Sequence, residues 1–380
     1  MTSQNNLEIF LVTAPGLEPL LRAEAVEKGF RKPKAIRGGV TVQGDWAAVF
    51  RANLDIRGAS KVLVRIGSFK VIHLAQLDLC LRTFPWAEFF RSDVPVRIQA
   101  SCKSSRIYHA GAVIERITNA ITDGLGVQVS ADAEICIKAR IQNDVCTLSI
   151  DTSGDLLHKR GHKEAVSKAP MRENLAALML RHCGYRGKEP VVDPMCGSGT
   201  FIIEAAEIAA SLYPGRSRHF AFEHLVTFDQ EKWQALQARQ INKTATARFY
   251  GSDDDAGAVR MSRANAERAG VTHLTDFQHH PVSELEPPDG PPGLVIINPP
   301  YGARIGNTKQ LNYLYRSLGQ VLMDRFSGWR VGVVTNTPSL AKNTGLPFAR
   351  ESERIDHGGQ RVKVYSTDPL PGSLEDSAED

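Results

Sequence analysis

The fold is decided by residues 191–203, which read Val-Val-Asp-Pro-Met-Cys-Gly-Ser-Gly-Thr-Phe-Ile-Ile. A short apolar run leads through a glycine-rich turn into a segment of helical periodicity. Glycines let the backbone approach a ligand closely, and the first turn of a helix presents unpaired N–H groups. The stretch lacks the lysine of a phosphate-binding loop and the G-x-G-x-x-G spacing of a dinucleotide fingerprint. Taken alone, it could also be a plain strand-to-helix connection.

Strands and helices alternate on both sides of this turn, from residue 171 onward. Helical periodicity appears at 172–184, 200–212, 228–241, 256–270 and 308–326, and short apolar runs lie at 191–194, 248–253, 274–280, 293–302, 329–338 and 361–367. This alternation predicts an α/β fold with a doubly wound, mostly parallel sheet. Ligands of such sheets lie at the carboxyl ends of the strands, where the glycine-rich turn stands.

The first 155 residues follow an α+β pattern instead. Strands are expected at 7–13, 39–44, 59–69 and 94–105, helices at 14–30, 73–84 and 108–126, and a hairpin over 135–154 with its turn at Asn143-Asp144. The expected domains are two α+β modules over 1–65 and 66–155, a basic connection over 156–168, the doubly wound domain over 169–365 and an acidic disordered tail over 366–380.

Charge is unevenly distributed along the 380 residues. The chain holds 46 Lys and Arg against 42 Asp and Glu, a formal net charge of +4. Residues 1–168 hold 23 basic and 17 acidic residues, or +6, whereas the last 15 residues carry −5. A basic front half is compatible with a nucleic-acid partner and equally with an ordinary solvated surface.

Cysteine spacing and hydropathy exclude several classes of protein. The six cysteines form no C-x-x-C pair and have no histidine cluster beside them, so we expect reduced thiols and no metal site. No stretch approaches the roughly 20 apolar residues of a membrane span. The N-terminus also lacks the basic start of a secretory signal, and we therefore expect a cytoplasmic protein.

Two further motifs follow strands of the predicted sheet. The first, at 249–255, reads Phe-Tyr-Gly-Ser-Asp-Asp-Asp. Asp253 lies nearest the strand end and is placed to accept hydrogen bonds from a ribose, while Asp255 suits the cap of the next helix. The second motif is Asn298-Pro299-Pro300-Tyr301, which ends the apolar run 294–297.

The Asn-Pro-Pro-Tyr motif favours recognition of an amine. Its prolines fix the backbone and remove two donors, so that the Pro299 carbonyl and the Asn298 side-chain oxygen can both act as acceptors. Two acceptors suit the two hydrogens of a planar exocyclic amine. Tyr301 offers a flat face on which a base can stack.

Together, the motifs DPMCGSGTFIIEAA, GSDDD and NPPYG, with LHKRGH and RENLAA before them, resemble the class I S-adenosylmethionine-dependent RNA methyltransferases that carry a THUMP domain. The pattern is similar to that of the 23S ribosomal RNA guanine-N2-methyltransferases. The resemblance implies a ferredoxin-like segment over 1–65, a THUMP domain over 66–155 and a class I methyltransferase domain. Many members carry a second methyltransferase domain, and we expect none within these 380 residues.

The resemblance also implies the site residues. S-adenosylmethionine would be bound by residues of the first two motifs, namely Asp193, Pro194, Gly197, Ser198, Gly199, Thr200 and Asp253. Asn298, Pro299 and Tyr301 would act on the target amine, and no metal would take part. An acidic turn usually follows the third strand to hold the adenine, but here the residues are Gln278-His279-His280-Pro281. Structured RNA is the implied partner, and Lys159, Arg160 and Lys163 of the connection are candidate phosphate contacts.

Several alternatives stay open on the sequence alone. Transfer RNA could replace ribosomal RNA as the substrate, and adenine N6 could replace guanine N2. A protein glutamine side chain also presents an amide to such a motif, although a basic α+β front half would then have no phosphate to bind. An RNA-binding scaffold without activity is a further reading. The oligomeric state is undetermined, with a monomer the expectation.

Overall fold

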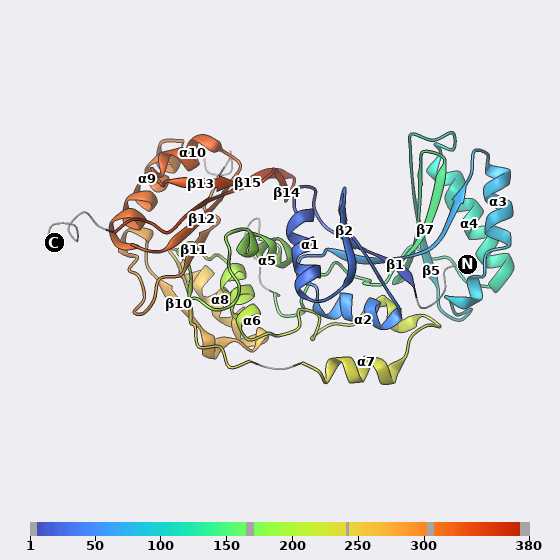
Figure 1. Cartoon of the computed structure of the whole chain (residues 1–380), viewed down its shortest axis with the longest axis horizontal. Coiled ribbons are helices and arrows are strands. Elements are labelled where there is room, and N and C mark those ends of the chain that lie inside the picture. Colours follow the sequence, from blue (N-terminus) through green and yellow to red (C-terminus); the bar gives the residue numbers. More distant parts are fainter. Residues whose placement is uncertain (1–5, 165–170, 241–242, 302–307, 373–380) are drawn as a thin grey trace. The chain divides into compact units, whose positions relative to one another are not determined.

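The structure is a computed structural model that describes residues 6–164, 171–240, 243–301 and 308–372. The chain divides into two compact units (Figure 1). The first comprises Met1–Thr13, Leu21–Leu157 and Gly215–Arg239, and the second Ala14–Leu20, His158–Pro214 and Gln240–Asp380.

The first unit is built on a seven-stranded sheet of order β2-β3-β1-β4-β7-β6-β5, in which only β5 and β6 pair in parallel. Its strands are β1 (Leu7–Val12), β2 (Arg31–Ile36), β3 (Gly39–Gly44), β4 (Lys61–Lys70), β5 (Val96–Lys103), β6 (Ile135–Gln142) and β7 (Val145–Asp151). Its helices are α2 (Trp46–Asp55), α3 (Leu74–Arg82), α4 (Ala110–Leu125) and α7 (Gln230–Gln237). Helix α1 (Glu18–Glu27) contributes residues to both units. Figure 1 shows α3 and α4 together on one side of β5 and β7.

The hairpin between β6 and β7 forms as the sequence predicts. Asn143 and Asp144 have φ values of 51° and 61°, so both turn residues are in the left-handed region that a tight hairpin needs. The turn fixes the register, in which Gln142 pairs with Val145 and Arg140 with Thr147. Every second residue of β6 and β7 consequently points to the same face of the sheet.

The compact units of the structure differ from the expected domains at two places. The boundary between residues 65 and 66 falls inside β4, which pairs with β1 at one end and with β7 along most of its length. One continuous sheet therefore runs through both predicted α+β modules. Residues 215–239, expected in the doubly wound domain, belong to the first unit, where Phe222 and Trp233 pack with Phe50 of α2 in an aromatic cluster.

The second unit contains an eight-stranded sheet of order β10-β9-β8-β11-β12-β15-β13, with β14 paired to β15. Its strands are β8 (Val191–Asp193), β9 (Phe249–Asp253), β10 (Thr275–His279), β11 (Leu294–Ile297), β12 (Arg330–Thr335), β13 (Phe348–Glu351), β14 (Ile355–His357) and β15 (Gln360–Thr367). Strands β8 to β12 are parallel, and β15 is antiparallel to β12. The helices are α5 (Glu173–His182), α6 (Thr200–Ala209), α8 (Ala256–Ala269), α9 (Thr308–Arg325) and α10 (Pro338–Asn343).

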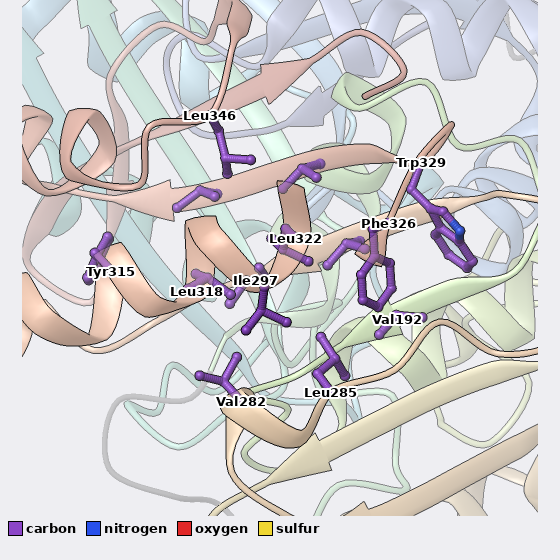
Figure 2. Close-up of a cluster of buried hydrophobic side chains, with 14 of the residues drawn as sticks. Val192, Val282, Leu285, Ile297, Tyr315, Leu318, Leu322, Phe326, Trp329 and Leu346 are labelled. Carbon is purple, nitrogen blue, oxygen red and sulfur yellow. The ribbon is translucent and has the colours of Figure 1, made fainter. Parts of the chain in front are cut away.

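Helices cover both faces of this sheet. On β12, Val331 and Val333 belong to a buried cluster. Leu318 and Leu322 of α9 lie in the same cluster (Figure 2). The residue between the two valines, Gly332, points to the other face, where a Cβ atom would lie 2.5 Å from Cys183 Sγ at the end of α5. Alternate residues of a strand face opposite sides, so α9 and α5 lie on opposite faces. The predicted doubly wound α/β fold is confirmed.

The C-terminal boundary also differs from the expected one. Strand β15 continues to Thr367, and the buried Leu370 donates its N–H to the Trp329 carbonyl oxygen at 2.9 Å. Residues 366–372 therefore belong to the folded unit, while the rest of the predicted tail lies outside the described residues. All six cysteines are free thiols. None of the described helices is long and apolar enough to cross a membrane.

Candidate active site

The motifs of the second unit meet around one cavity of about 1560 Å³. Its lining comes from the residues that follow β8, β9, β10 and β11, the carboxyl ends of four parallel strands, and from the connection 158–163. Each of the predicted cofactor and catalytic residues except Gly199 lines it, namely Asp193, Pro194, Gly197, Ser198, Thr200, Asp253, Asn298, Pro299 and Tyr301. Residues distant in sequence are therefore brought together at the sheet edge that the alternation of strands and helices predicts.

The turn after β8 depends on its two glycines. Gly197 and Gly199 have φ values of 56° and 79°, in the left-handed region that side chains disfavour. A Cβ atom on Gly199 would also lie 3.1 Å from Ser262 and 3.2 Å from Phe277. The glycines thus allow the turn to lie close to α8 and then to enter α6, whose N-cap is Gly199.

Two buried side chains of α8 hold the turn from behind. Ser262 Oγ donates to the Gly197 carbonyl oxygen at 2.9 Å, and Asn265 Nδ2 donates to the Ser198 carbonyl oxygen at 3.0 Å. Both side chains are fully buried. The sequence analysis did not single them out, although their spacing of three residues on the helix after the acidic motif places them on one face.

Two carboxylates flank the turn in different environments. Asp193 is buried and accepts the Met195 N–H, and burial raises its pKa well above the ordinary value despite that hydrogen bond. Asp253 is half-buried, and its two oxygens accept the N–H groups of Gly197 at 2.9 Å and of Asp255 at 3.0 Å. The Asp253 carboxylate therefore ties the turn to the end of β9. Asp255 caps α8 by accepting the Gly257 N–H, as expected.

The residues of the Asn-Pro-Pro-Tyr turn line the cavity. Asn298 Oδ1 is buried, and no donor of the described residues reaches it. Tyr315 of α9 donates its hydroxyl to the Pro300 carbonyl oxygen at 3.3 Å and lies 3.3 Å from Thr335 Oγ1. The turn is thus fixed by a buried tyrosine of α9, whose role cannot be distinguished in sequence from that of any core aromatic residue.

The turn after β10 departs from the acidic pattern that the resemblance implies. Pro281, Val282 and Ser283 line the cavity there, and no carboxylate of the described residues replaces the missing one in this turn. His279 Nε2 lies 3.1 Å from the Asp254 carbonyl oxygen, which ties the end of β10 to the turn after β9. This edge of the cavity consequently combines an apolar wall with the Ser283 hydroxyl.

Two of the three candidate RNA contacts are paired with carboxylates of α6 and α5. Arg160 is 2% exposed and lies 3.4 Å from Glu204 of α6, itself 1% exposed. Lys163 donates to Thr200 Oγ1 at 2.9 Å and lies 3.4 Å from Glu173 of α5. A buried charge needs a paired partner, so Arg160 neutralises an internal carboxylate and is not available to phosphates. This corrects the expectation for Arg160, whereas Lys163, which is partly buried and lines the cavity, stays a predicted phosphate contact.

The remaining basic residues of the connection differ from these two. Lys159 is exposed and stays a predicted phosphate contact. His158 lines the cavity, and burial together with the neighbouring cations lowers its pKa to about 4, so the imidazole is neutral at pH 7. Residues 165–168 of the predicted connection lie outside the described residues.

Other lining residues were not anticipated from the sequence. Tyr313 of α9 is 76% exposed at the cavity, and His357, Gly358 and Gln360 come from the β14–β15 hairpin. Gln360 Oε1 accepts from Asn336 Nδ2 at 2.7 Å, which orients its amide. Among the described residues, no group of three or more His, Cys, Asp and Glu side chains could hold a metal ion.

Comparison with protein families agrees with this geometry. Residues 160–359 match the family model described as RMKL-like, methyltransferase domain. The chain belongs to the RMKL-like methyltransferase family. Residues 8–63 match the RlmL ferredoxin-like domain, so the ferredoxin-like segment expected near the N-terminus of this RMKL-like chain is confirmed.

Relatives of known sequence or structure support the assignment. The ribosomal RNA large subunit methyltransferase K/L of Psychromonas ingrahamii is 35% identical over 357 residues, 90% of this chain and 47% of its own length. The RMKL-like chain thus spans about half the length of that relative. The crystal structure of a predicted N6-adenine-specific DNA methylase from Listeria monocytogenes is 28% identical, with a TM-score of 0.86 over 95% of this chain and 96% of that one.

A second solved structure confirms the fold class. SMU.472, a putative methyltransferase crystallised with S-adenosylhomocysteine (SAH), has a TM-score of 0.87 over 97% of this chain and 99% of that one. At 23% identity, this likeness shows the fold alone. The second unit of the RMKL-like chain is therefore a class I S-adenosylmethionine-dependent methyltransferase fold, as the motifs predict.

Proposed function

We propose that this chain transfers a methyl group from S-adenosylmethionine to the exocyclic N2 amine of a guanine in 23S ribosomal RNA. The observation that carries the proposal is Asn298, which lines the cavity and whose buried side-chain oxygen has no donor among the described residues. A buried polar atom without a partner costs about 1–3 kcal/mol, so its retention favours a ligand that donates to it. An exocyclic amine is such a ligand.

The residues around the glycine-rich turn fit the proposed cofactor. Its ribose hydroxyls would donate to Asp253, whose carboxylate oxygens each accept one backbone N–H and keep a second lone pair. Its carboxylate would lie near the first turn of α6, where Gly199 offers no capping side chain. The apolar wall at Pro281 and Val282 would contact the adenine, in place of the usual acidic residue.

The chemistry needs positioning more than acid–base catalysis. S-adenosylmethionine, when bound, supplies a methyl group on a positively charged sulfur that leaves as a neutral thioether. The amine nitrogen of guanine is a weak nucleophile because its lone pair is delocalised into the ring. Asn298 Oδ1 and the Pro299 carbonyl oxygen would accept its two hydrogens, favour a pyramidal nitrogen and direct the lone pair toward the methyl carbon. The nitrogen gains one bond to carbon and afterwards loses one proton to solvent.

The target base must leave its stack to reach this cavity. Tyr301 lines the cavity and is partly buried against the core cluster, which makes it a rigid surface for stacking. The exposed ring of Tyr313 is a second aromatic surface at the same cavity. We propose Asn298, Pro299 and Tyr301 as the residues that contact the base, with Tyr313 as a supporting contact.

Mass spectrometry of methylated nucleosides tests the proposal. The purified chain is incubated with isotopically labelled S-adenosylmethionine and either deproteinised 23S ribosomal RNA or transfer RNA, and the RNA is digested to nucleosides. Labelled N2-methylguanosine from ribosomal RNA supports the proposal. Label in transfer RNA alone would assign the alternative substrate, and the absence of labelled nucleosides would overturn an RNA methyltransferase.

Adenine N6 is a second candidate target. The name of the 28% identical Listeria monocytogenes protein, a predicted N6-adenine-specific DNA methylase, favours this possibility, and the same two acceptors suit that amine. The nucleoside digest separates the two, since N6-methyladenosine and N2-methylguanosine differ in mass. A protein glutamine target is less favoured by the basic first unit. The THUMP domain over 66–155, the cytoplasmic location and the monomeric state stay predictions.

A further inference from the structure

Gln360 is a cavity residue to which the proposed chemistry assigns no role. It begins β15, lines the cavity together with His357 and Gly358, and pairs with His357 across the Gly358-Gly359 turn. Gln360 Oε1 accepts a hydrogen bond from Asn336 Nδ2 at 2.7 Å. Among the described residues, no acceptor takes either hydrogen of Gln360 Nε2. A neutral donor with two hydrogens therefore remains for a bound ligand.

Hydrogen bonds fix which end of this amide is the donor. Thr337 Oγ1 donates to Asn336 Oδ1 at 2.7 Å, so the nitrogen of the Asn336 amide is the end that reaches Gln360. A nitrogen there requires an oxygen opposite it, which Gln360 supplies as Oε1. Both amides are thus held in one orientation. Toward a group bound in the cavity, Gln360 consequently acts as a donor and not as an acceptor.

The same series of hydrogen bonds leads to the Asn-Pro-Pro-Tyr turn. Thr337, whose hydroxyl bonds to Asn336, also donates its N–H to Thr335 Oγ1 at 3.2 Å. Thr335 Oγ1 lies 3.3 Å from the Tyr315 hydroxyl, which donates to the Pro300 carbonyl oxygen. The amide that would donate to a base and the turn that would accept from it are therefore linked by one series of polar contacts, which holds their relative positions.

The sheet places Gln360 on the opposite side of this turn from the proposed cofactor. In the strand order β9-β8-β11-β12-β15, the proposed cofactor residues Asp193 and Asp253 end β8 and β9. Asn298 follows β11, Gln360 begins the antiparallel β15, and all four residues line the cavity. Strands two apart in a sheet are separated by about 9.6 Å, which accommodates the edge of a base with a hydrogen bond of about 2.9 Å at each end.

We infer that Gln360 selects guanine by donating a hydrogen bond to its O6 oxygen. The N2 amine and O6 of guanine lie on the same edge of the base, with the N1–H between them. In adenine, the position across N1 from the amine carries a C–H group, which accepts no hydrogen bond. A donor held at this distance from Asn298 therefore favours guanine over adenine. The inference rests on the proposed function, which makes a base amine the target, and adds the residue that selects the base.

Base analogues test this residue against a single atom of the substrate. A synthetic RNA spans the guanine that is methylated in the nucleoside assay, and that base is replaced by 2-aminopurine, which keeps the amine but lacks O6. A second RNA carries 2,6-diaminopurine, which has an amine in place of O6. Initial rates of methyl transfer are measured for the full chain and for its Gln360→Leu and Gln360→Glu variants, with S-adenosylmethionine affinity and circular dichroism. The matched control is Gln320→Leu, which changes an exposed glutamine of α9.

One neutral hydrogen bond sets the size of the expected effect. Wild type should prefer guanine to 2-aminopurine about 10-fold, and Gln360→Leu should reduce this preference to about 2-fold or less, whereas Gln320→Leu keeps it. Gln360→Glu replaces the donor by an acceptor and should favour 2,6-diaminopurine over guanine. Equal wild-type rates on guanine and 2-aminopurine, or an unchanged preference in Gln360→Leu, overturn the inference and leave the proposed function intact. Labelled N6-methyladenosine, or no label in RNA, overturns both.

Discussion

The buried pair of Arg160 and Glu204 gives a prediction that separates two roles for the basic connection. Both residues are buried, and Arg160 Nη2 lies 3.4 Å from Glu204 Oε1. At this distance two unit charges attract by about 5 kcal/mol with an effective dielectric constant of 20. Removing one partner leaves the other charge buried, so Arg160→Met should lower the free energy of unfolding by about 3–5 kcal/mol.

Urea unfolding monitored by far-ultraviolet circular dichroism measures this loss. The double variant with Arg160→Met and Glu204→Met removes both charges and should recover most of the stability, because an apolar pair of similar volume is often neutral. RNA affinity at a temperature where each variant is folded should stay within about 2-fold of wild type. A stable Arg160→Met variant with a much weaker, less salt-dependent RNA affinity would refute the buried role and restore the surface role expected from sequence.

Three further predictions concern the cavity. Gly199→Ala should weaken S-adenosylmethionine binding and lower the free energy of unfolding by about 1–2 kcal/mol or more, because the φ of Gly199 is positive and α8 lies close to it. The control is Gly345→Ala, where φ is 71° and the surrounding space is open, so that only the backbone cost applies. Calorimetry of cofactor binding and thermal melts compare the two variants. Tyr315→Phe removes the donor to the Pro300 carbonyl oxygen, worth about 1 kcal/mol, and should lower kcat about 5-fold with unchanged cofactor Kd. In the folded protein the pKa of His158 is lowered from 6.5 to about 4, so between these pH values the unfolded chain binds more protons than the folded one. The free energy of unfolding should therefore fall as the pH drops from 6.5 to about 4. Thermal melts at several pH values should show a weaker pH dependence of stability for His158→Gln.

Elements with their own local signals are predictable from the sequence. The Asn143-Asp144 turn carries residues that tolerate positive φ, and the alternation on either side of it fixes both strands. The glycine-rich turn likewise lies where an apolar run meets a helical pattern. Helix α2 was not predicted, although Asp45 marks its start. The Asp45 carboxylate caps the helix by accepting the Ala48 N–H.

Features that depend on partners distant in sequence are not predictable in this way. Strand β13 has no alternation and is defined only by its pairing with β15 at the sheet edge. The sequence of the basic run at 158–163 is typical of a solvated surface. The carboxylates that pair with Arg160 and Lys163 lie on α6 and α5, so the pairing cannot be predicted from the run itself. The domain boundary inside β4 is equally invisible, since a strand gives no local sign of which sheet neighbours it will have.

The central claim is that Asn298 and the Pro299 carbonyl hold the target amine. Single-turnover methyl transfer by the Asn298→Ala variant tests it most directly, with Asn343→Ala, a partly exposed asparagine on α10, as the control. Loss of a preorganised acceptor should lower the rate about 10²–10³-fold while the S-adenosylmethionine Kd stays within about 2-fold. A variant that transfers methyl groups at close to the wild-type rate would contradict the account.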